Sequence, residues 1–126
     1  MNKFSLITGG ALCGTGVMLG AFAAHGLKAM ISPEMVAVFQ TGVNYQFIHG
    51  LALVLFGILG LMGFNLKWPT IFATVGVVFF SGSLYLLATT GIKLFGPITP
   101  LGGLCFIVSW LVFIVQVIKH KPAQVN

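Results

Sequence analysis

Charged residues are scarce in this chain. Only 6% of its 126 residues are charged, and six lysines stand against one acidic residue, Glu34. Because 58% of the residues are hydrophobic and the mean hydropathy is +1.09, a soluble domain of this length would have almost no polar surface. The composition therefore excludes a soluble globular domain and indicates an integral membrane protein.

The net charge of +5 does not indicate a nucleic-acid partner. The lysines stand apart and form no basic stripe, which is typical of residues that flank membrane spans. They are Lys3, Lys28, Lys67, Lys93, Lys119 and Lys121. We expect membrane lipids as partners, with a second copy of the chain or another membrane protein as a further candidate.

Cysteine is rare as well, with two residues in the chain. Cys13 and Cys105 lie within apolar runs and lack the C-x-x-C spacing of a redox or zinc site. We interpret both as buried small side chains. The cysteines therefore predict neither a metal site nor a redox cofactor.

Long apolar runs are abundant. Four of them, each about 18 to 21 residues long, can cross roughly 30 Å of hydrocarbon at about 1.5 Å per residue. They cover residues 4–24, 47–64, 70–89 and 101–118. The runs lack the alternation of barrel strands. We predict an all-α polytopic membrane protein, an antiparallel bundle of four transmembrane helices that forms one domain over residues 1–126.

The segment 33–43, between the first two runs, predicts a short amphipathic helix. Ser32 is a suitable N-cap, Pro33 suits the first helical position, and Glu34 favours the positive end of the helix dipole. This helix should lie at the membrane interface or extend the second span outward, with Gly42 as the expected bend.

The lysines also predict the orientation of the chain. With four spans, Lys28 and Lys93 share one side of the membrane, and the other four lysines share the side that holds both termini. The side richer in lysine faces the cytoplasm. We therefore predict that both termini are cytoplasmic.

Several glycines are spaced for close helix packing. Gly10 and Gly14, and likewise Gly16 and Gly20, form small-xxx-small frames in the first run. Gly102 and Gly103 open the fourth span. We expect these glycines to pack helices within the bundle, and dimerisation through the first run remains the alternative.

A group of polar side chains interrupts the apolar runs. We predict that they form a polar cluster or ligand site toward the ends of the spans farthest from the termini, because a polar group in hydrocarbon needs a partner. A network across the helices would join His25, Gln46, His49 and Tyr85. The residues of the predicted cluster are His25, Tyr45, Gln46, His49, Ser81, Ser83, Tyr85 and Thr99.

Four sequence blocks strongly resemble the small four-span membrane family of unknown function that includes the bacterial YgdD and YwdK proteins. They are GAFAAHGLK, TGVNYQFIHGLAL, SGSLYLLATTG and GPITPLGG followed by SW, in this order. The resemblance implies a bacterial inner-membrane protein and carries over no established activity. Besides the cluster residues above, its motifs include Gly26, Pro100, Gly102 and Gly103.

Three functions fit these observations. The preferred one is a non-catalytic membrane module without a cofactor, in which the cluster fixes helix register, holds a lipid or docks a partner. The first alternative is a haem- or metal-binding redox module that uses His25 and His49, although further ligands are missing. The second is a small oligomeric transporter with a titrating histidine. Hydrolysis through Ser81 or Ser83 with His49 lacks an orienting acid.

Overall fold

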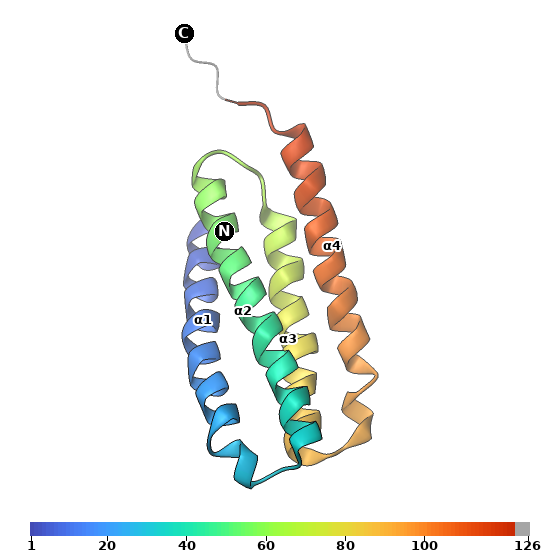
Figure 1. Cartoon of the computed structure of the whole chain (residues 1–126). Coiled ribbons are helices and arrows are strands. Elements are labelled where there is room, and N and C mark those ends of the chain that lie inside the picture. The colour runs from blue at the N-terminus through green and yellow to red at the C-terminus, as the bar shows by residue number, and fades with distance from the viewer. Residues whose placement is uncertain (123–126) are drawn as a thin grey trace.

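The protein folds into four long helices and two short 3-10 helices, seen here in a computed structural model that describes residues 1–122 (Figure 1). The long helices are α1 (Asn2–Ala24), α2 (Pro33–Leu61), α3 (Lys67–Thr90) and α4 (Ile98–Lys119), and the short ones are η1 (Leu27–Ala29) and η2 (Lys93–Phe95). Four stretches of the described chain are helical, long and apolar enough to cross a membrane. The predicted all-α fold with four spans is confirmed.

Consecutive long helices run antiparallel and pack as neighbours, α1 on α2, α2 on α3 and α3 on α4. Helices α1 and α4 therefore lie at opposite edges, on either side of the central pair (Figure 1). The N-terminus, the α2–α3 turn and the end of α4 lie at one end of the bundle, here called the termini end. The opposite end holds η1 and η2 and is called the η end.

Helix α2 is longer than the second predicted span. It begins at the predicted cap, where the Met35 amide donates to Ser32 Oγ at 3.2 Å, and it continues without interruption to Leu61. The segment 33–43 is thus not a separate amphipathic helix with a bend at Gly42; it extends the second span, which is one of the two predicted placements. The reason is tertiary packing, because Phe39 of this segment is buried in one cluster with Ala23 at the end of α1.

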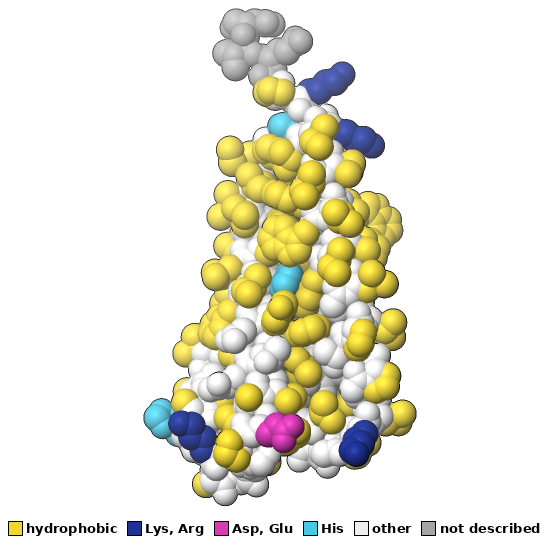
Figure 2. Space-filling model, turned by 45° about the vertical axis from the view of Figure 1, so that its right-hand side comes forward, with side chains coloured by type: hydrophobic (Ala, Val, Ile, Leu, Met, Phe, Trp, Pro, Cys, Tyr) yellow, Lys and Arg dark blue, Asp and Glu magenta, His cyan; other side chains and the backbone are white. Residues whose placement is uncertain are grey.

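Charged side chains mark the two ends of the bundle, and hydrophobic side chains form the band between them (Figure 2). Lys3 and Lys28 flank α1 and are 25 residues apart, which corresponds to roughly 37 Å of helix, slightly more than about 30 Å of hydrocarbon. The residues midway between the flanking lysines are Thr15 on α1, Phe80 on α3 and Phe106 on α4. These three residues mark the middle of the bundle.

Glycines allow α3 and α4 to approach closely. A Cβ on Gly102 would clash with the backbone of Phe80, and a Cβ on Gly76 would lie 2.5 Å from the Phe106 ring. A Cβ on Gly103 would be 3.8 Å from the Phe80 ring, which is an ordinary contact. Of the two predicted packing glycines of α4, Gly102 therefore supplies the tight approach and Gly103 does not.

The glycines of α1 fall into two pairs with different surroundings. A Cβ on Gly16 would lie 3.1 Å from the Phe47 ring, and one on Gly20 would also contact α2. A Cβ on Gly10 or Gly14 would meet nothing within 4 Å. The predicted packing within the bundle is therefore wrong for Gly10 and Gly14. The spacing of small residues does not by itself show which face of a helix contacts its neighbour.

We predict that Gly102→Ala lowers the free energy of unfolding in mixed detergent micelles by about 1–3 kcal/mol, because the added methyl group meets backbone and forces α3 and α4 apart. Gly82→Ala, on α3, is the control, since a Cβ there meets nothing within 4 Å. It should leave the stability unchanged or raise it by up to about 1 kcal/mol through helix propensity. Equal effects of the two changes would contradict close packing at Gly102.

Candidate functional site

The polar side chains predicted to cluster at one end of the spans are spread along the bundle. Gln46 bonds to Leu12 and Thr15 of α1, which places it near the middle of the bundle, and His49 follows one turn later on α2. His25 ends α1 at the η end, where it is exposed. The predicted placement of His49 with His25 at the ends of the spans farthest from the termini is therefore wrong, because the outward extension of α2 moves its polar residues toward the centre.

Gln46 connects three helices. Its Nε2 donates to the carbonyl of Leu12 and to Thr15 Oγ1, both at 2.9 Å, and its Oε1 accepts from the hydroxyl of Tyr85. The side chain is buried, at 3% exposed. The predicted links from Gln46 to the first span and to Tyr85 of the third span are present.

The two serines of the predicted cluster also join helices. Ser81 Oγ donates to the carbonyl of Gly42 at 2.6 Å, which ties α3 to α2. The hydroxyls of Ser83 and Thr99 lie 2.6 Å apart, which ties α3 to the start of α4. Neither serine is bonded to His49, so the geometry does not contain the serine–histidine pair of a hydrolase.

Two further serines lie in the half nearer the termini and were not predicted. Ser5 Oγ donates to the carbonyl of Leu53 at 2.6 Å, and Ser109 Oγ donates to that of Pro69 at 2.7 Å. Ser109 is the one hydroxyl residue in its apolar run 101–118, which is the signal that could have identified it, whereas Ser5 shares its run with Thr8 and Thr15 and has no such signal. Polar contacts between helices therefore extend over both halves of the bundle.

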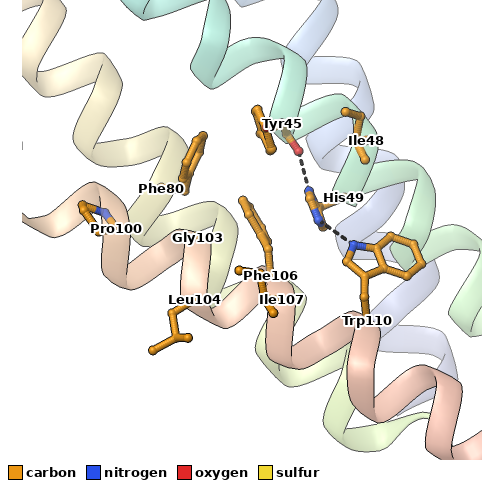
Figure 3. Close-up of a pocket in the computed structure, with 10 residues that line it drawn as sticks. All are labelled: Tyr45, Ile48, His49, Phe80, Pro100, Gly103, Leu104, Phe106, Ile107 and Trp110. Atoms are coloured by element: carbon orange, nitrogen blue, oxygen red, sulfur yellow. Dashed lines mark hydrogen bonds between the residues drawn. The ribbon is translucent and has the colours of Figure 1, made fainter.

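His49 has a partner on each ring nitrogen (Figure 3). Nδ1 lies 3.0 Å from the carbonyl of Tyr45, and Nε2 lies 3.1 Å from the indole nitrogen of Trp110 on α4. A carbonyl can only accept and an indole N–H can only donate, so His49 is the neutral tautomer with its proton on Nδ1. Its ring stacks on Phe106, with centroids 3.6 Å apart and planes at 8°.

This geometry contradicts the shared haem or metal site of His25 and His49. Both ligand nitrogens must lie about 2 Å from a shared ion. His25 is ten residues beyond Thr15 along α1, which separates it from the level of Gln46 and His49 by at least roughly 15 Å. In addition, the described residues contain no group of three or more His, Cys, Asp or Glu side chains that could hold a metal ion.

A cavity of about 600 Å³ lies between α2 and α4 and is named here the α2–α4 groove (Figure 3). Aromatic rings form much of its wall, and the groove extends along α4 over about 15 Å, or ten residues. Its mouth residues Ile48, Leu104 and Ile107 are 51%, 58% and 58% exposed, so it opens on the lipid-facing surface. The rings are those of Tyr45, His49, Phe80, Phe106 and Trp110.

The groove could not be predicted from local patterns in the sequence. Phe106 and Trp110 are apolar residues in an apolar run, and only their spacing of one helical turn shows that they share a face. His49 and Trp110 are 61 positions apart, so their contact follows from the fold and not from a local motif.

Tyr45 differs from the other polar residues of the predicted cluster. Its ring lines the α2–α4 groove and packs against Phe80, with centroids 4.5 Å apart, and the side chain is 39% exposed. Within residues 1–122 its hydroxyl has no hydrogen-bond partner, whereas the hydroxyl of Tyr85 is bonded to Gln46. Tyr45 is therefore a residue of the groove wall whose hydroxyl is not used for a hydrogen bond within the described chain.

Comparison with known proteins finds relatives that match this chain over most of their own length. The family described as "Protein of unknown function (DUF423)" matches residues 19–103. The chain is 47% identical over 112 residues to the UPF0382 membrane protein SH2409 of Staphylococcus haemolyticus (strain JCSC1435), covering 87% of this chain and 92% of that protein. It is 40% identical over 123 residues to the UPF0382 membrane protein YwdK of Bacillus subtilis (strain 168), covering 94% and 98%. No solved structure matches.

We predict that the hydroxyl of Tyr85 and the amide of Gln46 are energetically coupled. Tyr85→Phe and Gln46→Leu should each destabilise the protein, and the double variant should lose about 0.5–2 kcal/mol less than the sum, because the second change removes no further bond between the two. The measurement is unfolding of all four proteins in mixed detergent micelles. Strict additivity would show that this bond does not hold α2 and α3 together.

Proposed function

Because the chain belongs to the DUF423 family, whose function is unknown, we propose its function from the α2–α4 groove alone. The chain is a multi-pass membrane protein of the family expected from its sequence blocks. Its proposed role is non-catalytic: the groove holds a lipid-soluble molecule that enters from the bilayer. The observation that carries the proposal is a cavity of about 600 Å³ that opens toward lipid near the middle of the bundle.

The size and lining of the groove suit an apolar ligand. Pockets for small molecules usually have volumes of about 300–1,000 Å³ and walls of hydrophobic and aromatic side chains. No lysine or glutamate lines the groove, and the imidazole of His49 is neutral. An apolar molecule can therefore enter without bringing a charge into hydrocarbon, and it gains dispersion contacts with the rings.

The arrangement of polar groups supports a binding role rather than catalysis. A general base must offer a free lone pair near its substrate, and Nε2 of His49 accepts from Trp110 instead. The one acid, Glu34, lies in the first turn of α2 at the η end, away from the groove. Ser81 and Ser83 use their hydroxyls for contacts between helices. These residues explain a stable scaffold and supply no reacting pair.

The proposed location is the bacterial inner membrane, with both termini in the cytoplasm. The termini end carries four lysines and the η end carries Lys28 and Lys93, so the rule that positive residues stay inside favours this orientation. Lys67 lies 5.6 Å from the ring of Trp68, and such a pair is typical of a membrane interface. In this orientation the α2–α4 groove extends from the centre of the membrane into the outer leaflet.

We predict that a side chain placed in the groove displaces the bound molecule. Gly103→Leu adds a side chain to a wall residue that has room for a Cβ, so it should fill the groove and leave the fold intact. Native mass spectrometry of protein purified in mild detergent should show a lipid-soluble molecule, about one per chain, on the wild type and not on Gly103→Leu. Gly82→Leu is the control, because Gly82 lies outside the groove. Equal retention by all three proteins, or none by any, would contradict the proposed function.

The orientation can be measured with single cysteines in a chain that lacks Cys13 and Cys105. A cysteine that replaces Lys28 or Lys93 should react with a membrane-impermeant maleimide on intact spheroplasts, because both positions are at the η end. A cysteine that replaces Lys67 should react only after lysis. The reverse pattern would place the termini outside and the groove in the cytoplasmic leaflet.

A further inference from the structure

We propose that the ligand of the α2–α4 groove is an uncharged, planar ring that bears a carbonyl group and an apolar tail, the chemical class of the isoprenoid quinones. The hydroxyl of Tyr45 donates to the carbonyl, and the ring lies among the aromatic side chains of the groove. This inference rests on the proposed function and specifies its ligand. Four observations carry it: a free hydroxyl, an aromatic wall, the absence of charge and the depth of the groove.

The hydroxyl of Tyr45 requires an acceptor. Every buried side-chain nitrogen or oxygen atom among the described residues has a hydrogen-bond partner. Tyr45, by contrast, lines the groove with 39% of its surface exposed, and its hydroxyl forms no hydrogen bond within residues 1–122. A hydroxyl in hydrocarbon without a partner is costly. An alkyl chain offers no acceptor, so a ligand that completes the site contains an oxygen or nitrogen with a free lone pair.

The walls of the groove favour a ring. Tyr45 and Phe106 have nearly parallel planes, 14° apart, with centroids 6.0 Å from each other, and Phe80 packs against both. Pairs of aromatic rings in offset-stacked or edge-to-face arrangements gain stabilisation beyond that from the area they bury. A planar head group therefore gains more from this wall than an acyl chain does.

The lack of charge selects a neutral acceptor. The groove contains no lysine, and the imidazole of His49 has its two nitrogens engaged by Tyr45 and Trp110. A carboxylate or a phosphate would therefore be desolvated without a cation to pair with it, which is strongly unfavourable. The acceptor that fits is a carbonyl oxygen, which separates this ligand from fatty acids and from the head groups of phospholipids.

The depth of the groove in the membrane also favours a neutral ring over a phospholipid. It includes Phe80 and Phe106, the midpoints of α3 and α4 between their flanking lysines. The ester carbonyls of a phospholipid remain near the head groups, at the edge of roughly 30 Å of hydrocarbon. A neutral ring with an apolar tail has no such restriction and can enter the bilayer as far as Tyr45.

The test uses Trp110 as a reporter, because it lines the groove and the chain has one other tryptophan, Trp68. Trp68→Phe protein is placed in phosphatidylcholine nanodiscs and titrated with decylubiquinone, and quenching of the remaining fluorescence is recorded. We expect saturable quenching. Tyr45→Phe should raise the Kd about fivefold, the effect of one hydrogen bond. Tyr85→Phe removes the chain's other phenol hydroxyl, outside the groove, and should leave the Kd unchanged.

Two controls make the outcomes distinguishable. Gly103→Leu should abolish saturable quenching, and dodecylbenzene, which has the tail and the ring without a carbonyl, should compete equally well in Tyr45→Phe and in its parent. Saturable quenching with an unchanged Kd in Tyr45→Phe would overturn the role of the carbonyl and leave the proposed function standing. Linear quenching that is the same in Gly103→Leu would show partition into the bilayer only, and would overturn the quinone assignment. Loss of the co-purifying molecule in Gly103→Leu would then still support the broader function.

Discussion

Each buried polar side chain of this bundle has to find its partner within the protein, because hydrocarbon offers none, and the rest of the structure follows from that requirement. Gln46 meets it by bonding to α1 and α3 at once. Ser5, Ser81 and Ser109 meet it by donating to carbonyls of neighbouring helices, and Ser83 meets it through the hydroxyl of Thr99. A short serine side chain can reach a backbone carbonyl of the next helix only when the two backbones are close. These hydrogen bonds and the glycine contacts therefore depend on each other.

The α2–α4 groove is the place where this close packing ends. Gly102 brings the backbone of α4 against that of α3, whereas α4 reaches α2 through the large side chains of Phe106 and Trp110. Helix α4 is therefore close to α3 and farther from α2, and the large side chains do not completely fill the space between α2 and α4. The space left is lined by rings, and His49 is locked between its two partners at its edge.

Local signals predicted the helices well and the depth of the residues poorly. The cap at Ser32 and the apolar runs depend on neighbouring positions, and the fold class followed from them. The placement of His49 depends on whether Phe39 packs against α1, which is a contact between distant parts of the chain. The partner of His49, Trp110, is equally distant in sequence. The sequence therefore pointed to polar residues that join helices, such as Gln46 and Ser81, but not to their depth or to the groove.

Helix α2 is longer than the two edge helices α1 and α4. With 29 residues it is about 43 Å long, whereas α1 and α4, with 23 and 22 residues, are each about 34 Å. A bilayer whose thickness matches the shorter helices leaves close to two turns of α2 to emerge on the η side, together with the η1 segment packed against it. This protruding part of α2 is stiff, because it continues a transmembrane helix. A lateral force on it outside the membrane would therefore tilt α2, which carries the groove residues Tyr45 and His49.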